Sequence, residues 1–417
     1  MKKLLILGAT ACEVDLVRRA QALGYYVVVT DDHDDWTLAP AKYVADEAWN
    51  ISWSDIDALK AKCRERGVDG ASAGYSEFRV ENLIKLCAEL GFPCYATTEQ
   101  LEITRDKFKF KEACRKHGVP TVKEYASPAD VDEFPVIVKP VDRAGSIGVG
   151  VATNAEELQK AVDYAMEKSI VKRVIIERYM QSVKVDFYYA VEDGKIELIS
   201  SCDTIPAADN GFERVVQTAW LYPSRYLDAA LAKVDASIRR MIEGMGIRYG
   251  CIFYSGFVDE NDEFVFFECG FRLEGGRQYE YARRRGLMNF QDIFILHATE
   301  GTTRTMKRGG GVNPSLKCAT VNVYAKAGTI AKIEGFDRIA LNGRCSLAAA
   351  TARIGQKCDD DKAILDKIGI FSFCSESSER LRKDVEKAYS LLTVEDVDGN
   401  DMIYDRLDAK RIETHWN

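Results

Sequence analysis

The sequence is poor in metal-binding residue patterns. It has only four histidines in 417 residues, and its 12 cysteines are scattered without any Cys-x-x-Cys pair. With so few histidines and no closely paired cysteines, a zinc site is not expected. Cysteines in apolar segments, such as Cys87, Cys251 and Cys269, are typical of buried reduced thiols. The cysteine pattern therefore favours a cytoplasmic protein without disulfides.

Long apolar runs and an excess of positive charge are also missing. No uncharged apolar run reaches the 18 or so residues that a membrane span needs, so no membrane segment is expected. The start, MKKLLILGATACEVD, has too short an apolar run for a signal peptide and is better explained as a first strand. The formal net charge is -8 and the pI is about 5.4, which disfavours a nucleic-acid partner.

A glycine-rich dinucleotide fingerprint is absent as well. The N-terminal segment alternates strand and helix patterns to about residue 90, which predicts a parallel α/β sheet. Its first turn, G-A-T-A-C-E, keeps only Gly8 of G-x-G-x-x-G, so a nicotinamide-dependent oxidoreductase is the weaker alternative. The strand ends at 8–12, 31–32 and 74–77 remain candidates for binding a small substrate.

Lysines in unusual places mark the middle of the chain. A basic helical pattern runs from Thr97 to Gly118 and includes Lys107. In "FPVIVKPVDRAGSIGVG", Lys139 lies inside an apolar strand, where an ammonium group is costly unless it meets water or an anion. The glycine-rich loop that follows can expose backbone N–H groups to a phosphate. Lysine and loop together predict a phosphate-binding hairpin, followed by a helix with a capping box at Thr153 and Glu156.

Two further strands end in charged residues. "RVIIERYM" carries Glu177, and "FVFFECGFRLEGG" carries Glu268 with Arg272 four residues later. In this order, the β-α-β region, the two lysines, the glycine loop and these strands resemble the ATP-grasp superfamily, specifically its carbamoyl-phosphate-synthase-like and biotin-carboxylase-like ligases.

The resemblance implies a multidomain α/β and α+β fold. A parallel α/β pre-ATP-grasp domain is expected over residues 1–96. A two-lobed ATP-grasp domain should follow, with a linker helix and small lobe over 97–180 and a large lobe over 181–305. Residues 306–417 should form a small β-rich α+β domain packed on these lobes.

The resemblance also implies where ATP is bound. Lys107 and Lys139 match the two lysines directed at the ATP phosphates, where cations offset several negative charges. Gly145, Ser146 and Gly148 match the mobile loop that closes over the phosphates and excludes water.

The remaining nucleotide contacts follow from the same resemblance. The hinge that binds adenine through its backbone is assigned to three consecutive residues, Glu177, Arg178 and Tyr179. Phe266 is expected on the same strand face as Glu268 by period-two alternation, so that it could cover the adenine. At the position where the family has an acidic residue that binds the ribose, this sequence has Lys184, and Asp186 follows two residues later.

The residues for metal binding and phosphoryl transfer are assigned to the strand "FVFFECG" and the residues directly after it. Glu268 matches the magnesium ligand, and Arg272 matches the arginine that stabilises the acyl phosphate or the tetrahedral intermediate. The family's asparagine position is Gly270, and its second carboxylate position falls on Ser255 or Gly256. The protein therefore offers few ligands for Mg²⁺, although Mg²⁺ often keeps waters and binds substrate phosphates.

The resemblance implies an ATP-dependent ligase that joins a small carboxylate to an amine or related nucleophile, with ATP and Mg²⁺ as cofactors. The incomplete metal site keeps a second hypothesis open, an ATP-binding sensor or scaffold without turnover. A homodimer is a further expectation. The sequence leaves the two substrates unidentified.

Overall fold

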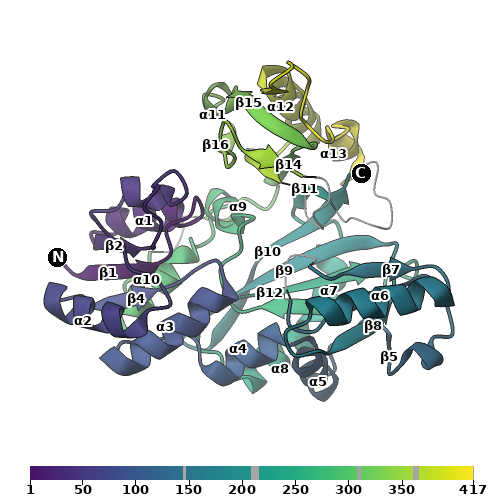
Figure 1. Ribbon diagram of the computed structural model, residues 1–417, viewed down its shortest axis with the longest axis horizontal. Helices are drawn as coiled ribbons and strands as arrows, with labels where there is room; N and C mark the ends of the chain where they lie inside the picture. Colours follow the sequence, from purple (N-terminus) through teal and green to yellow (C-terminus); the bar gives the residue numbers. More distant parts are fainter. Residues whose placement is uncertain (144–146, 208–215, 308–310, 360–365, 417) are drawn as a thin grey trace.

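The N-terminal sheet is parallel, as the sequence predicts (Figure 1). The computed structural model describes residues 1–143, 147–207, 216–307, 311–359 and 366–416. Four strands lie in the order β3-β2-β1-β4: β1 (Lys3–Leu7), β2 (Tyr26–Thr30), β3 (Glu47–Trp49) and β4 (Gly70–Ser72). They alternate with α1 (Glu13–Ala22), α2 (Ile56–Arg66) and α3 (Glu77–Leu90). The strands β1 and β2 are buried almost throughout, as expected for a parallel sheet covered on both faces.

A helix from much later in the chain covers this sheet. The helix α10 (Gln291–Glu300) packs against β1, β4 and α1 and is buried at nine of its ten residues. Arg19 on α1 binds both carboxylate oxygens of Asp292, each at 2.6 Å. A Cβ atom at Gly70 would lie 2.0 Å from the carbonyl oxygen of Ala298, so only glycine allows this contact. The first domain is thereby fixed to the large lobe.

The basic segment after this domain forms two helices, where the sequence analysis predicts one. They are α4 (Thr98–Arg105) and α5 (Lys107–His117). Asp106 has extended backbone, and its carboxylate accepts hydrogen bonds from the N–H groups of Phe108 and Lys109. Such an N-cap starts a new helix, and it places Lys107 at the first position of α5.

The small lobe is a four-stranded antiparallel sheet in the order β5-β8-β6-β7. Its strands are β5 (Glu124–Tyr125), β6 (Val136–Pro140), β7 (Gly150–Ala152) and β8 (Val174–Arg178). The helix α6 (Ala155–Lys168) packs on β6 and β7. Its N-cap is Asn154, one residue beyond the predicted Thr153, and Glu157 rather than Glu156 bonds back to Thr153. The capping prediction was therefore wrong by one residue.

The large sheet has eight strands in the order β13-β12-β9-β10-β11-β14-β18-β16. They are β9 (Val183–Glu192), β10 (Lys195–Pro206), β11 (Gln217–Tyr222), β12 (Tyr249–Val258), β13 (Phe264–Gly270), β14 (Lys317–Tyr324), β16 (Cys345–Ala350) and β18 (Lys367–Ser375). The β9–β10 turn has positive φ at Asp193 and Gly194, as is typical of an Asp-Gly hairpin turn. The sheet continues across residue 306, so the large lobe and the C-terminal part share it.

The rest of the C-terminal part packs on one end of this sheet (Figure 1). It contains a three-stranded sheet of β15 (Gly328–Glu334), β17 (Lys357–Cys358) and β19 (Thr393–Asp396). Its helices are α11 (Phe336–Ala340), α12 (Ser378–Leu391) and α13 (Lys410–Thr414). The large lobe adds α7 (Leu227–Lys233), α8 (Asp235–Gly244) and α9 (Gln278–Arg284).

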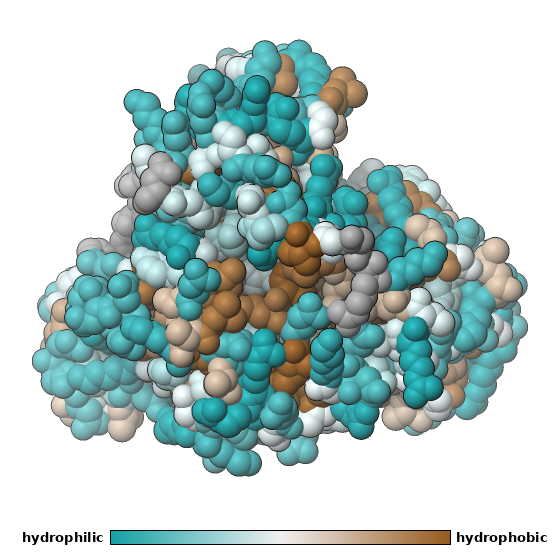
Figure 2. All heavy atoms as spheres, turned by 180° about the vertical axis from the view of Figure 1, so that it is seen from behind, coloured by the Kyte–Doolittle hydropathy of each residue, from teal (hydrophilic) through white to brown (hydrophobic). Residues whose placement is uncertain are grey.

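The surface of the molecule is mostly hydrophilic on its back face, with apolar side chains gathered in a central band (Figure 2). In the described part of the chain, no helix combines the length and hydropathy that crossing a membrane requires.

One buried ion pair joins the linker helices to the small lobe and yields a stability prediction. Lys111 on α5 is fully buried, and its Nζ lies 2.5 Å from a carboxylate oxygen of Glu177 on β8. Replacing Lys111 with Met should lower the free energy of unfolding by about 2 kcal/mol. This is below the ~3–5 kcal/mol typical of a broken buried pair, because Glu177 keeps a second lysine.

Urea unfolding followed by circular dichroism measures this change. The matched control is Lys160→Met on α6, whose ion pair with Glu156 is solvent-exposed and should contribute less than about 0.5 kcal/mol. Equal unfolding midpoints for the two variants would contradict the structural role of Lys111.

Candidate active site

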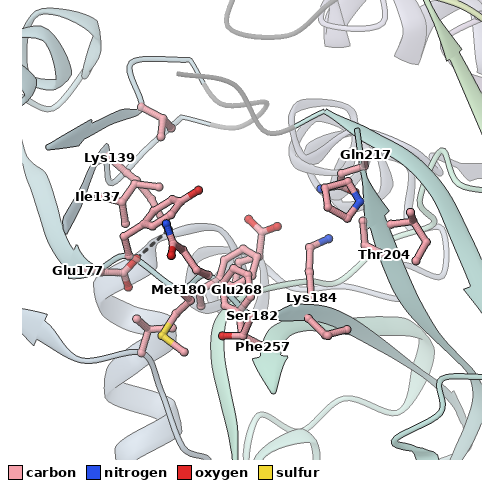
Figure 3. Close-up of a pocket in the computed structure, with 18 of the residues that line it drawn as sticks. Ile137, Lys139, Glu177, Met180, Ser182, Lys184, Thr204, Gln217, Phe257 and Glu268 are labelled. Carbon is pink, nitrogen blue, oxygen red and sulfur yellow. Dashed lines mark hydrogen bonds and ion pairs between the residues drawn. The ribbon is translucent and has the colours of Figure 1, made fainter. Parts of the chain in front are cut away.

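A cavity of about 940 Å³ lies between the small lobe and the large sheet (Figure 3). Strands β6 and β8 form one wall, and β9, β12 and β13 form the other. Its apolar lining residues include Val122, Ile137, Met180, Phe257 and Phe267. The lining also carries an excess of positive charge, from Lys107, Lys139, Arg143, Arg178, Lys184, Arg225 and Arg411. An apolar slot next to a cationic region fits a planar base that carries phosphates.

Lys139 projects from β6 into this cavity, at the position the sequence predicts. Its Nζ lies 2.7 Å from an oxygen of Glu177 and 5.0 Å from the centre of the Phe267 ring. Burial by itself raises the pKa of the Glu177 carboxyl, but the charges of Lys139 and Lys111 outweigh it and hold that pKa below its ordinary value. Glu177 therefore stays ionised and positions the ammonium group of Lys139.

Lys107 enters the same cavity from the start of α5. Its Nζ donates a hydrogen bond to the carbonyl oxygen of Arg143 at 3.0 Å, and it makes no ion pair with any described residue. Burial lowers the pKa of Lys107 below its ordinary value, with the charge of Glu268 opposing that effect. A desolvated ammonium without a carboxylate partner is ready to receive an anion.

The glycine loop is described only in part. Gly145 and Ser146 lie outside the described residues. Gly148 has φ +76°, and a Cβ there would lie 2.7 Å from side-chain atoms of both Lys168 and Pro140. Its two neighbours, Ile147 and Val149, line the cavity.

The predicted hinge lies along the edge of the cavity. Glu177, Arg178 and Tyr179 all line it. However, the N–H of Arg178 donates to Lys123 and that of Tyr179 donates to Pro135 within the small-lobe sheet. The N–H of Met180, the next residue, has no partner among the described residues. A backbone donor for a base is therefore available one residue beyond the predicted hinge.

The predicted position of Phe266 was wrong. Phe266 is fully buried in the core against Phe187 and Tyr254, and Phe267 lines the cavity instead. The cause is a β-bulge: Ser255 pairs with Glu268, but the next residue, Gly256, pairs with Phe266. The extra residue interrupts the alternation on which the prediction rested.

Glu268 lines the cavity, whereas Asp186 does not. Asp186 is buried on β9, where Ser255 Oγ donates to it at 2.5 Å and Lys184 Nζ lies at 3.1 Å. The cavity-facing member of this pair is Lys184, the residue that replaces the expected acid. Among the described lining residues the carboxylates are Glu177 and Glu268, and Glu177 is held by two lysines.

Arg272 lies beyond the end of β13 and is not among the cavity-lining residues. Its Nε donates to Glu77 of the first domain at 2.6 Å, and its Nη1 donates to the carbonyl oxygen of Leu273. The guanidinium also stacks 5.3 Å from the centre of the Phe253 ring. Arg272 thus links the strand that carries Glu268 to the N-terminal domain.

The missing side chain at Gly270 has a packing explanation. Phe253 on β12 pairs directly with Gly270, and its ring covers the glycine. A Cβ at residue 270 would lie 2.4 Å from a ring carbon of Phe253. The ring therefore occupies the space that a side-chain ligand would need.

Sequence reasoning missed the far end of the cavity. It is lined by Thr204 and Gln217 of the β10–β11 region and by Arg411, Thr414 and His415 of the C-terminal segment. His415 Nε2 lies 2.9 Å from buried Asp203, and Arg411 donates to the carbonyl oxygen of Pro206. No local motif could have identified these residues, because long-range contacts of Arg411 and His415 with β10 bring them there.

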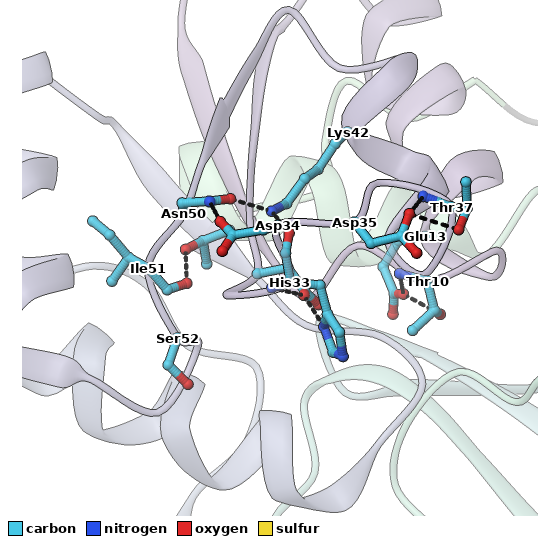
Figure 4. Close-up of polar contacts among 12 residues, drawn as sticks. Thr10, Glu13, His33, Asp34, Asp35, Thr37, Lys42, Asn50, Ile51 and Ser52 are labelled. Carbon is cyan, nitrogen blue, oxygen red and sulfur yellow. Dashed lines mark hydrogen bonds and ion pairs between the residues drawn. The ribbon is translucent and has the colours of Figure 1, made fainter.

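The strand ends of the first domain form a separate polar cluster (Figure 4). Asp31, Asp32 and His33 could hold a metal by the spacing of their ligand atoms. His33 Nδ1 is 2.6 Å from Asp31, and buried Lys42 donates to the carbonyl oxygen of His33. Asp31, His33 and Lys42 are thus held by contacts within the cluster.

Part of the chain resembles a known family and curated proteins. Residues 106–277 match the family described as carbamoyl-phosphate synthase L chain, ATP binding domain. The formate-dependent phosphoribosylglycinamide formyltransferase of Erythrobacter litoralis is 28% identical over 200 residues, which cover 45% of this chain and 49% of the relative. The enzyme of the same name from Synechococcus is 32% identical over 189 residues, covering 43% and 47%. The chain thus spans about half the length of these curated relatives.

Solved structures match almost the whole fold. The L-amino acid ligase of Bacillus licheniformis has a TM-score of 0.77 at 16% identity, with 95% of this chain and 99% of the other covered. The phosphoribosylglycinamide synthetase of Anaerococcus prevotii has a TM-score of 0.72 at 16% identity, with 94% and 99% covered. The biotin carboxylase domain of a 2-oxoglutarate carboxylase from Hydrogenobacter thermophilus, solved with MgADP, has a TM-score of 0.74 at 18% identity, with 96% and 91% covered.

The contact between Phe253 and Gly270 yields a prediction. Gly270→Ala should lower stability by about 1–3 kcal/mol, because the added methyl group forces the ring to move. Thermal unfolding measures this change, and Phe253→Leu in the same chain should restore part of the loss. The control is Gly343→Ala, where no atom lies within 4 Å of the added Cβ. A Gly270→Ala variant as stable as that control would show that the ring does not exclude a side chain.

Proposed function

We propose that this chain is an ATP-dependent ligase of the ATP-grasp superfamily, because residues 106–277 match the family described as carbamoyl-phosphate synthase L chain, ATP binding domain. It would join a small carboxylate to an amine or related nucleophile through an acyl phosphate, releasing ADP and phosphate. The observation that carries this proposal is the convergence of Lys107, Lys139 and Glu268 on one cavity beside an apolar slot. Cations for the phosphates, a carboxylate for a metal and a wall for a base are the parts that phosphoryl transfer needs.

The nucleotide is proposed to bind with its base in the apolar slot and its phosphates between the two lysines. The rings of Phe257 and Phe267, with centres 5.1 Å apart, would cover the base, and the N–H of Met180 would donate to it. Lys139 then faces the phosphates with its position set by Glu177. Lys107 gains the anionic partner that it lacks among the described residues.

Glu268 can hold magnesium, although it is a single protein carboxylate ligand. Glu268 offers carboxylate oxygens to the cavity, which are the ligands that Mg²⁺ prefers. Because Mg²⁺ commonly keeps waters and shares phosphate oxygens, one protein carboxylate is sufficient to hold it beside a nucleotide. When bound, the ion would neutralise charge on the transferring phosphoryl group.

Arg272, which lies outside the cavity lining, is proposed to stabilise the acyl phosphate where the end of β13 meets the first domain. Its Nη2 group has no hydrogen-bond partner among the described residues, whereas Nε and Nη1 are held by Glu77 and Leu273. Two fixed nitrogens orient the guanidinium, so that the third can donate to a phosphoryl oxygen without reorganisation.

The names of similar proteins support a small carboxylate and an amine as substrates. They include an L-amino acid ligase and formate-dependent formyltransferases. A reducing, cytoplasmic location is supported by the free thiols of Cys87, Cys251 and Cys269. A homodimer is supported by the dimer named for the 2-oxoglutarate carboxylase domain, and light scattering would test it.

The alternative function, an ATP-binding sensor without turnover, is favoured by one observation. At Gly270 the ring of Phe253 excludes a second ligand, so the metal is held by few protein groups. Turnover separates the two functions, because a sensor would bind ATP without releasing ADP.

A panel of small carboxylates and amines, with ADP release as the readout, tests the ligase proposal. At least one pair should raise ADP release above the rate with either substrate alone. Lys139→Met should then lower kcat/KM by about 10- to 100-fold, the effect of losing one charge-assisted phosphate contact. The control is Lys123→Met, an exposed lysine paired with Asp132 outside the cavity. Tight ATP binding without ADP release for every pair would favour the sensor.

Lys107 yields a pH prediction. In the free protein burial lowers its pKa from 10.5, whereas bound phosphates should raise it again. Nucleotide binding should therefore take up protons between the lowered pKa of the free protein and the higher pKa of the complex, and affinity should fall as pH rises through the lowered pKa.

Titration calorimetry in two buffers of different ionisation enthalpy measures this uptake. The Lys107→Met variant should take up fewer protons on nucleotide binding than wild type. Identical uptake by wild type and variant would show that Lys107 does not face the phosphates.

A further inference from the structure

Three neighbouring strands carry a row of polar side chains on one face of the large sheet. Ser255 on β12 lies between Asp186 on β9 and Glu268 on β13, in register with both. Directly opposed residues in antiparallel strands place their side chains on the same face. Two carboxylates therefore flank one serine, and the hydroxyl of Ser255 donates to Asp186 at 2.5 Å.

Lys184 joins this row from the cavity side. It lies two residues before Asp186 on β9, so its side chain lies on the same face. Its Nζ is 3.1 Å from Asp186 Oδ2, and the side chain lines the cavity together with Glu268 (Figure 3). Burial lowers the pKa of Lys184, but the charges of Asp186, Glu274 and Glu268 outweigh it and raise that pKa above its ordinary value.

A third carboxylate completes the surroundings of this ammonium group. Glu274 accepts a hydrogen bond from Tyr188 OH at 2.7 Å and one from Gln278. Burial raises the pKa of Glu274, and the charge of Asp186 adds to that effect, whereas Lys184 opposes it. The ammonium of Lys184 therefore balances an excess of negative charge contributed by two strands, which carry Asp186 and Glu268, and by the loop that carries Glu274.

With Lys184 bound to Asp186, the carboxylates do not converge as metal ligands would. Among the described residues, the group whose ligand atoms are close enough to hold a metal lies at residues 31–33, not at this cavity. A divalent cation beside Asp186 would be repelled by the positive charge of Lys184. Lys184 also already pairs with the Asp186 carboxylate that such a cation would need as a ligand. Arg272, the other cation that acts on Glu274, is bound to Glu77.

We propose that the ammonium group of Lys184 replaces a second divalent cation between Asp186 and Glu268, so that the site takes one metal ion, at Glu268. The nucleotide-dependent part of this inference rests on the proposed function. Lys184 supplies one positive charge that is fixed to the chain, whereas a divalent metal ion would supply two positive charges and could exchange with solvent. Its removal should free Asp186, Ser255, Glu268 and Glu274 to hold an additional ion through oxygen ligands.

Counting bound Mn²⁺ by electron paramagnetic resonance tests this inference. Wild type should bind one Mn²⁺ for each bound non-hydrolysable ATP analogue. Lys184→Ala should bind one Mn²⁺ more than wild type, both with and without the analogue. Lys184→Arg, which keeps the charge, should match wild type. So should Lys195→Ala, which removes an exposed lysine at the start of β10. Circular dichroism checks that each variant is folded.

Two Mn²⁺ per analogue in wild type, or equal counts for wild type and Lys184→Ala, would overturn the inference. If Lys184→Ala does not fold, the wild-type count decides, supported by Lys184→Gln, which retains more of the side chain. If the analogue does not bind, the proposed function fails. The difference between wild type and Lys184→Ala without nucleotide then still decides the role of Lys184.

Discussion

The buried carboxylate of Glu177 organises the site, because it cannot remain charged without its two lysines. Removing a carboxylate from water costs several kcal/mol, and Lys111 and Lys139 offset that cost at 2.5 and 2.7 Å. The three residues belong to α5, β8 and β6, so this one cluster fixes the linker helix, the hinge strand and the phosphate-facing lysine together. The position of Lys139 in the cavity is thus a consequence of how Glu177 is neutralised.

The large sheet meets a related electrostatic constraint with different side chains. Asp186, Glu268 and Glu274 bring negative charge to one region, and Lys184 supplies the balancing charge from within the chain. At Gly270 the ring of Phe253 fills the space of a further ligand. An ammonium group and an aromatic ring thereby leave Glu268 as the carboxylate that faces the phosphate region from this sheet.

Much of the fold and part of the site can be predicted from local sequence. Helices 56–66 and 77–90 and the turn at Asp193–Gly194 follow from periodicity and turn chemistry, which act over a few residues. Lys107, Lys139 and Glu268 are recognisable because a charge in or beside an apolar segment needs a partner. Phe266 was misplaced because a bulge depends on the pairing of two strands, which the pattern of one strand does not reveal.

The sequence by itself determined the order of the elements and the chemical groups available to bind a nucleotide and a metal. Tertiary structure alone decided which of these groups meet. It turned Phe267 rather than Phe266 toward the cavity, placed Arg272 against Glu77, and brought Arg411 and His415 to the far wall. The physical reason is that strand register, bulges and the packing of distant helices depend on contacts between residues far apart in the chain, and these contacts leave no periodic signal.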